Sequence, residues 1–180
     1  MNKVKNLLVR LLRCIMTPLR YTSIRRNGQV CLSEKVELPN ERFLAVVSEV
    51  LEQGHSAVIG VRGYSMRPFL ENARDKVKLV YSEKVKVGDA VLAQITPGRY
   101  VLHRIIHKEG NLLTLQGDGN VRGVENCRVD DVCGVVVEYI HPGRVLKSSD
   151  SVLRMEIQIW RVLRPIRRFL LVFYKATLPE

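Results

Sequence analysis

Residues 57–69 read AVIGVRGYSMRPF, and within this stretch an apolar run is followed first by a glycine and a serine and then by a proline. The stretch begins as a short apolar run and reaches Gly63, Ser65 follows two positions later, and Pro68 then stops regular structure. We therefore expect a strand over Ala57–Arg62 that ends in a turn carrying the serine. Such a serine is more often part of an ordinary turn, but a catalytic nucleophile needs the same exposed position beside free backbone N–H groups.

Short strand patterns continue downstream of this turn and dominate the middle of the chain. Turn signals separate them, among them Pro97-Gly98 and Gly117-Asp118-Gly119. Many short strands without helices between them favour an antiparallel sheet or a partly closed barrel, so the predicted fold class is mainly β. The expected strands are Ala57–Arg62, Val77–Tyr81, Ala90–Ile95, Tyr100–His107, Leu112–Gln116 and Val132–Ile140.

Helical patterns are expected before the first strand and at the two ends of the chain. One apolar stripe predicts a helix over 40–53, and a weaker alternation predicts an edge strand over 29–38. Amphipathic patterns predict helices at 3–16 and 150–174, the second kinked or broken at Pro165. The apolar side chains expected to pack on the core or on each other are Leu7, Leu11, Ile15, Trp160, Leu163 and Phe169.

The charge distribution divides the chain into three parts. The net charge is +11, yet residues 27–143 hold 14 basic and 15 acidic groups and are nearly neutral. The excess lies in residues 1–26, with seven basic groups and no acid, and in residues 144–180, with eight basic groups and three acids. We interpret these parts as a basic amphipathic N-terminal helix, a folded core and a basic amphipathic helical tail.

A neutral core with basic ends narrows the range of partners. A nucleic-acid-binding core should carry its own basic face, so nucleic acid is not an expected partner. Basic amphipathic helices suit an anionic membrane surface, and the alternative is that the charges form solvated helix faces. No run of about 20 apolar residues predicts a membrane span, and no convincing secretory signal is present. We expect a cytoplasmic protein with peripheral membrane contact.

The cysteines do not form a recognisable metal or disulfide pattern. They are scattered, without a C-x-x-C pair or a histidine at zinc-finger spacing. Buried or incidental thiols in a reducing compartment are therefore expected, and no metal site is predicted. The four positions are Cys14, Cys31, Cys127 and Cys133.

Two further segments contain side chains suited to catalysis. On an alternating strand, His103 shares a mainly apolar face with Val101 and Ile105, where an imidazole can be oriented as a general base. The alternative is a half-buried histidine bonded to a neighbouring carbonyl. Asp118 ends the next strand between two glycines, where its carboxylate can hold a turn or accept a hydrogen bond from an imidazole.

Four ordered segments resemble the superfamily of serine peptidases that includes signal peptidases and self-cleaving repressors. They correspond to the G-x-S-M-x-P-like nucleophile box, a G-D-x-V strand opening, the strand of the catalytic base and a G-D-x-N-like box. The segments are Gly63–Pro68, Gly88–Val91, His103–Ile105 and Gly117–Asn120, within a resemblance that spans about 58–137. Histidine followed by Arg-Ile resembles the endoplasmic-reticulum-like branch, whereas most bacterial members have lysine as the base.

The resemblance implies roles for individual residues. Ser65 would be the nucleophile, His103 its base and Asp118 the group that orients the base or its turn. Gly63, Tyr64 and Met66 would contribute to the oxyanion hole or to substrate binding, without a metal or other cofactor. The histidine branch has an acidic pair after its last box, and this chain has Val121–Val124 there. The third catalytic member therefore stays open among Asp118, Glu125 and Asp131.

The fold implied is a signal-peptidase-like, self-cleaving-repressor-like antiparallel β core over 27–143. The activity implied is that of a serine endopeptidase, a hydrolase, that cleaves an extended segment of a protein or peptide by a Ser-His mechanism. The alternative is a catalytically silent module that keeps the fold and binds a peptide or partner. A transcriptional repressor is not expected, because residues 27–56 hold neither a helix-turn-helix domain nor a small-residue cleavage site.

Overall fold

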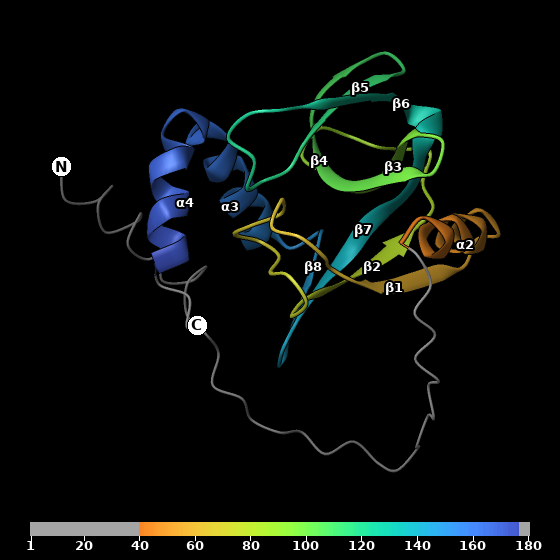
Figure 1. Cartoon of the computed structure of the whole chain (residues 1–180), viewed down its shortest axis with the longest axis horizontal. Coiled ribbons are helices and arrows are strands. Elements are labelled where there is room, and N and C mark those ends of the chain that lie inside the picture. The colour runs from red at the N-terminus through yellow and green to blue at the C-terminus, as the bar shows by residue number, and fades with distance from the viewer. Residues whose placement is uncertain (1–39, 177–180) are drawn as a thin grey trace, which may run out of the picture.

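The computed structural model describes residues 40–176, which form an antiparallel sheet and three α-helices (Figure 1). The predicted mainly β class is therefore confirmed. The strands are β1 (Ser56–Gly60), β2 (Lys76–Val80), β3 (Ala90–Thr96), β4 (Arg99–Glu109), β5 (Leu112–Gln116), β6 (Glu125–Arg128), β7 (Val132–His141) and β8 (Arg144–Lys147). The predicted helix at 3–16 and strand at 29–38 lie outside the described residues.

The long strand β7 joins two parts of the sheet. Strand order is β1-β2-β7-β3-β4-β5-β6, and β8 also pairs with β7. Val132–Val135 pairs with β3, whereas the following residues pair with β2 and β8. Figure 1 shows β7 running from the curled β3–β6 part toward β1 and β2. The strands of the predicted catalytic histidine and of the serine turn thus belong to different parts of one sheet.

All six predicted strands are present, and two further strands were not predicted. β5 has the predicted bounds, whereas the other five differ by one or two residues at one or both ends. The unpredicted strands are β6 and β8, each four residues long. The predicted helical tail 144–180 therefore begins with a strand, because β8 completes a hairpin with the end of β7.

The helices cover one side of the sheet and follow their predicted order. α2 (Asn40–Glu52) precedes β1 and packs Val47 and Leu51 into the core. α3 (Ser151–Val162) starts where the side chain of Asp150 accepts a hydrogen bond from Val152 N at 2.9 Å. A 3₁₀ turn, η2 (Arg164–Ile166), then separates it from α4 (Arg167–Ala176), which confirms the predicted break at Pro165.

The break changes which side chains of the tail face the core. The predicted burial of Trp160 is confirmed, and Leu163 is half-buried. The predicted packing of Phe169 is wrong, because its side chain is 65% exposed. The 3₁₀ turn interrupts the 3.6-residue period, so Leu170 and Tyr174 occupy the inner face of α4 instead.

Two apolar clusters fill the structure. The first lies where β1, β2 and β7 meet α2, α3 and α4, and it includes Met66, Phe69 and Leu70 from the serine segment. The second lies against the other face of β3, β4 and β5 and includes Ile105 and Leu115. No helix within residues 40–176 has the length and apolarity needed to cross a membrane.

Candidate active site

Buried side chains hold the predicted nucleophile segment on the core. Met66 is 1% exposed, and the N–H of Leu70 donates to the carbonyl of Met66 at 3.0 Å. Gly63 has φ +86°, a left-handed conformation that glycine adopts without strain, and its N–H donates to Asn72 Oδ1 at 2.9 Å. Ser65 therefore lies half-buried on a turn that is fixed on both sides.

An ion pair between Arg67 and Glu71 holds the same turn. Arg67 Nε donates to Glu71 Oε2 at 2.9 Å, and its guanidinium stacks over the exposed ring of Tyr64 at 4.1 Å. Tyr174 of α4 donates to Glu71 Oε2 at 3.2 Å. Burial, with the charge of Glu71 nearby, raises the pKa of Tyr174 to about 12, so the hydroxyl stays protonated as a donor.

The glycine-flanked turn after β5 packs directly on the backbone of the serine segment. The N–H of Gly119 donates to the carbonyl of Ser65 at 2.7 Å. A Cβ at Gly117 would lie 2.5 Å from that carbonyl oxygen, and a Cβ at Gly119 would lie 2.6 Å from the carbonyl oxygen of Tyr64. Both distances are below any real Cβ contact. The two glycines are therefore required by the close approach of two backbones.

Asp118, between these glycines, is bonded to Arg104 and not to His103, so of its two expected roles the contacts support the holding of the turn. Its Oδ1 accepts from Arg104 Nε at 2.8 Å, and its carbonyl accepts from Trp160 Nε1 at 2.9 Å. Arg104 also donates to the carbonyl of Gly88 at 2.8 Å. Burial alone would lower the pKa of the Arg104 guanidinium, but the charge of Asp118, Tyr139 and the hydrogen bonds to both residues together outweigh burial and raise it. The carboxylate thus fixes the turn, and the carboxylate that contacts His103 belongs to another residue.

That residue is Glu125, one of the three carboxylates left open by the sequence. Its Oε2 lies 2.8 Å from Nδ1 of His103, and Arg99 approaches its Oε1 at 3.9 Å. His103 is buried on the apolar face of β4, as predicted. Asp131, the third alternative, instead accepts from the backbone N–H of Arg128 at 2.6 Å. The strand β6 buries Cys127 and exposes Asn126 and Arg128. Because it has only four residues, the sequence contains no period that would place Glu125 beside His103.

Ser65 and His103 are connected through hydrogen bonds of intervening residues. No hydrogen bond joins the two side chains within residues 40–176, so the expected dyad contact stays a prediction. Their connection runs through Gly119, which bonds the carbonyl of Ser65, and through Asp118, which bonds Arg104, the residue after His103. Nε2 of His103 has no bonded partner among the described residues, which leaves it able to accept a proton.

The predicted oxyanion and substrate residues have different surroundings. Tyr64 is 57% exposed and able to contact a substrate. The side chain of Met66 is buried and anchors the turn, so its backbone N–H is the group available for the expected role. The N–H of Gly63 is bonded to Asn72 Oδ1. Among the described residues, no acceptor is found for the backbone N–H groups of Ser65 and Met66.

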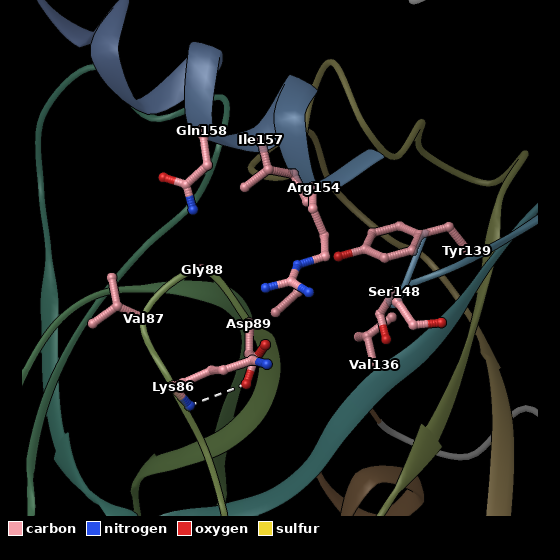
Figure 2. A pocket seen from close by; sticks show the side chains of 12 residues that line it. Lys86, Val87, Gly88, Asp89, Val136, Tyr139, Ser148, Arg154, Ile157 and Gln158 are labelled. Atoms are coloured by element: carbon pink, nitrogen blue, oxygen red, sulfur yellow. Dashed lines mark hydrogen bonds between the residues drawn. The ribbon is translucent and has the colours of Figure 1, made fainter. Parts of the chain in front are cut away.

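A separate cavity lies behind Arg104. Its volume is about 170 Å³, and Figure 2 shows Arg154 of α3 reaching toward it beside Tyr139 and Asp89. Gly88 also lines the cavity, and Gly88 and Tyr139 both accept hydrogen bonds from Arg104. Ser65, His103 and Glu125 do not line it. The cavity therefore adjoins the groups that hold Arg104 and not the candidate catalytic side chains.

The thiols and carboxylates of the described region form no metal cluster. Cys127 and Cys133 are free and buried, and burial raises the pKa of Cys127 to about 11. No group of three His, Cys, Asp or Glu residues within residues 40–176 could hold a metal ion. Cys14 and Cys31 lie outside that part. Comparison with known proteins finds no matching family model and no significantly similar curated protein.

Proposed function

We propose that this chain is a serine endopeptidase with a signal-peptidase-like β core, in which Ser65 is the nucleophile and His103 the general base. The observation that carries the proposal is the pair of buried His103 and half-buried Glu125, at 2.8 Å. These residues lie on β4 and β6, on either side of β5, and the glycine turn that follows β5 packs on the backbone of Ser65. All four segments of the resemblance meet in this network, since Arg104 bonds both Gly88 and Asp118. An imidazole held by a carboxylate near a serine turn is the arrangement that nucleophilic hydrolysis needs.

Each group has a defined part in the reaction. Glu125 accepts a hydrogen bond from Nδ1–H of His103, which leaves Nε2 unprotonated and able to take the proton of the Ser65 hydroxyl. The serine oxygen attacks the scissile carbonyl, and the proton passes from the imidazole to the leaving amine. A water molecule then cleaves the acyl-enzyme by the reverse proton transfers, which regenerates Ser65.

The backbone around the nucleophile supports the charge that develops on the substrate. The N–H groups of Ser65 and Met66 are the donors available for an oxyanion. The carbonyl of Ser65 is held by Gly119, so the direction of these N–H groups is set before the substrate binds. Such preorganised donors typically contribute about 10²–10³ in turnover each.

An extended peptide is the substrate class that the sheet favours. β1 is an edge strand and leads directly into the serine segment, and its residues Ser56, Val58 and Gly60 are exposed. A peptide that pairs with this edge would gain main-chain hydrogen bonds while its scissile bond approaches Ser65. The ring of Tyr64, exposed at the same turn, would contact its side chains.

Labelling with a fluorophosphonate probe, followed by mapping of the modified residue, tests the proposal. We expect modification of Ser65, its loss in Ser65→Ala, and a loss of at least about a hundredfold in rate for His103→Ala. The matched control is Ser149→Ala, which removes an exposed serine between β8 and α3. This variant should be labelled as the parent protein is. Cleavage of a mixed peptide library, read by mass spectrometry, gives the second readout.

The alternative is a silent peptide-binding module with the same fold. It is favoured by the absence of a Ser65–His103 hydrogen bond within the described residues. A folded parent protein that is neither labelled nor able to cleave the library, yet retains peptides on a column, would replace the peptidase proposal with this one.

A further inference from the structure

The outer face of α4 carries an apolar stripe that the described protein leaves exposed. Phe169 and Val172 are each 65% exposed, and Ile166, just before the helix, is 45% exposed. Phe169 and Val172, three residues apart, lie along one side of α4, and Ile166 precedes them in the 3₁₀ turn. Single exposed apolar residues are common, but three at this spacing at one end of the chain mark an interaction surface.

The charges around this stripe all have one sign. Arg164 and Arg168 are exposed beside it, and residues 157–176 contain no aspartate or glutamate. A second copy of the chain in a two-fold dimer would place this cationic face against itself. An anionic lipid surface instead satisfies both the arginines and the apolar side chains between them.

The inner face of the same helix touches both backbone segments of the candidate active site. Tyr174 donates to Glu71, which holds Arg67 in the serine segment. Arg167, at the start of the helix, donates to the carbonyl of Asn120 at 3.4 Å, at the end of the glycine-flanked turn. Figure 1 shows α4 on the outside of the molecule, beyond α3. One helix thus contacts the catalytic segments with one face and solvent with the other.

We propose that α4 is an interfacial helix that docks this protein on an anionic membrane. Ile166, Phe169 and Val172 enter the boundary between headgroups and acyl chains, while Arg164 and Arg168 contact the acidic headgroups. Because an α-helix is about 10 Å across, docking places the serine segment roughly one helix diameter from the lipid surface. The enzyme would then cleave extended protein segments that lie at that surface. This consequence rests on the proposed peptidase function, whereas the docking itself does not.

Vesicle co-sedimentation of the full chain tests the docking. We expect the protein to bind vesicles of phosphatidylcholine with phosphatidylserine, and to bind pure phosphatidylcholine much less. Binding should weaken between about 0.01 M and about 1 M salt, as the Debye length falls from about 30 Å to about 3 Å. The measurement is repeated with Ser65→Ala, so that loss of peptidase activity and loss of lipid binding are read separately.

Variants of α4 locate the contact. Arg164→Gln with Arg168→Gln should weaken the vesicle partition coefficient about 25-fold, because each arginine near an anionic surface contributes about fivefold. Phe169→Ser should weaken it about tenfold through lost apolar insertion. The matched controls are Arg42→Gln with Arg144→Gln, two exposed arginines elsewhere, and Leu112→Ser, an exposed leucine on β5. Circular dichroism verifies that every variant is folded.

Fluorescence gives an independent readout of insertion. The protein has one tryptophan, Trp160, which is buried. In Phe169→Trp, a blue shift of the fluorescence and protection from a quencher on adding anionic vesicles therefore report on position 169. Leu112→Trp should show neither change. Equal partition coefficients for the α4 variants and their controls overturn the proposal. Any vesicle binding would then come from another part of the chain, such as the basic residues 1–26. A change in oligomeric state of Phe169→Ser without a change in lipid binding also overturns the proposal, in favour of a second copy as the partner.

Discussion

Nδ1 of His103 lies 2.8 Å from Oε2 of Glu125, although 22 residues separate them in the chain. The contact exists because β5 pairs with both β4 and β6, which aligns Ile105 with Leu115 and Leu115 with Glu125. Side chains on one face of the sheet then meet across the β4–β5 and β5–β6 pairs. The carboxylate is thereby fixed to the imidazole by the strand register rather than by a local motif.

Glu125→Gln should lower peptidase turnover without unfolding the protein. A glutamine has no negative charge to stabilise the imidazolium, so a loss of about 10²–10⁴ in turnover is expected. Arg99→Gln removes only the weaker 3.9 Å contact to the same carboxylate and is the matched control. Labelling rates of Ser65, measured beside circular dichroism, check this, and full activity in Glu125→Gln would remove Glu125 from the mechanism.

Asp118→Asn should act mainly through folding. The substitution leaves the guanidinium of Arg104 buried without its anion, which typically costs about 3–5 kcal/mol of unfolding free energy. Asp130→Asn breaks a surface pair with Arg128 and should change the unfolding free energy by less than about 1 kcal/mol. Denaturant unfolding distinguishes them. A stable, folded Asp118→Asn protein as inactive as Ser65→Ala would instead assign Asp118 a direct part in the reaction.

Gly117→Ala should destabilise the protein and displace the serine segment. The added methyl group would lie 2.5 Å from the carbonyl oxygen of Ser65, and two backbones must shift to accept it. Overpacking of this kind typically costs about 1–3 kcal/mol. Gly60→Ala is the control, because nothing lies within 4 Å of a Cβ there. Equal melting temperatures for the two variants would contradict the close approach.

Asp75 should make the fold sensitive to acid. Burial alone would raise the pKa of this carboxyl, but hydrogen bonds from His141, Arg74 and the N–H of Glu71 outweigh burial and lower it to about 2. Because the folded pKa lies below the ordinary value of 3.8, the stabilisation is present above about pH 4 and is lost as pH falls toward 2.

The loss corresponds to about 2 kcal/mol of unfolding free energy. Urea unfolding of the parent and of Asp75→Asn between pH 5 and pH 2 measures it, with pH values chosen to bracket this window. The difference in unfolding free energy between the two proteins should shrink with falling pH. A difference that stays constant over this range would show that folding leaves the pKa of Asp75 unshifted.

Local sequence patterns were sufficient to predict most of the secondary structure. The alternation of β4 placed His103 on an apolar face, and the structure has it buried there. Pro165 predicted a break that the structure shows as a 3₁₀ turn. These features depend on period and on backbone chemistry within a few residues, which a sequence displays directly.

Short or rotated elements could not be predicted in the same way. β6 and β8 are four residues each, too short to show a period, and pairing with β5 and β7 makes them strands. Phe169 was expected inside because the helical pattern was followed through the break. Which side chain faces inward after a 3₁₀ turn depends on the turn's own rotation.

The sequence by itself determined the mainly β class, the serine turn, the strand of His103 and the concentration of positive charge at the ends. Only the tertiary structure assigned the carboxylates, giving Asp118 to Arg104 and Glu125 to His103. Both acids follow β5 within ten residues, and nothing in their spacing distinguishes them. The difference arises from strand register, because neighbouring residues of β4 point to opposite faces of the sheet and each face meets its own partner.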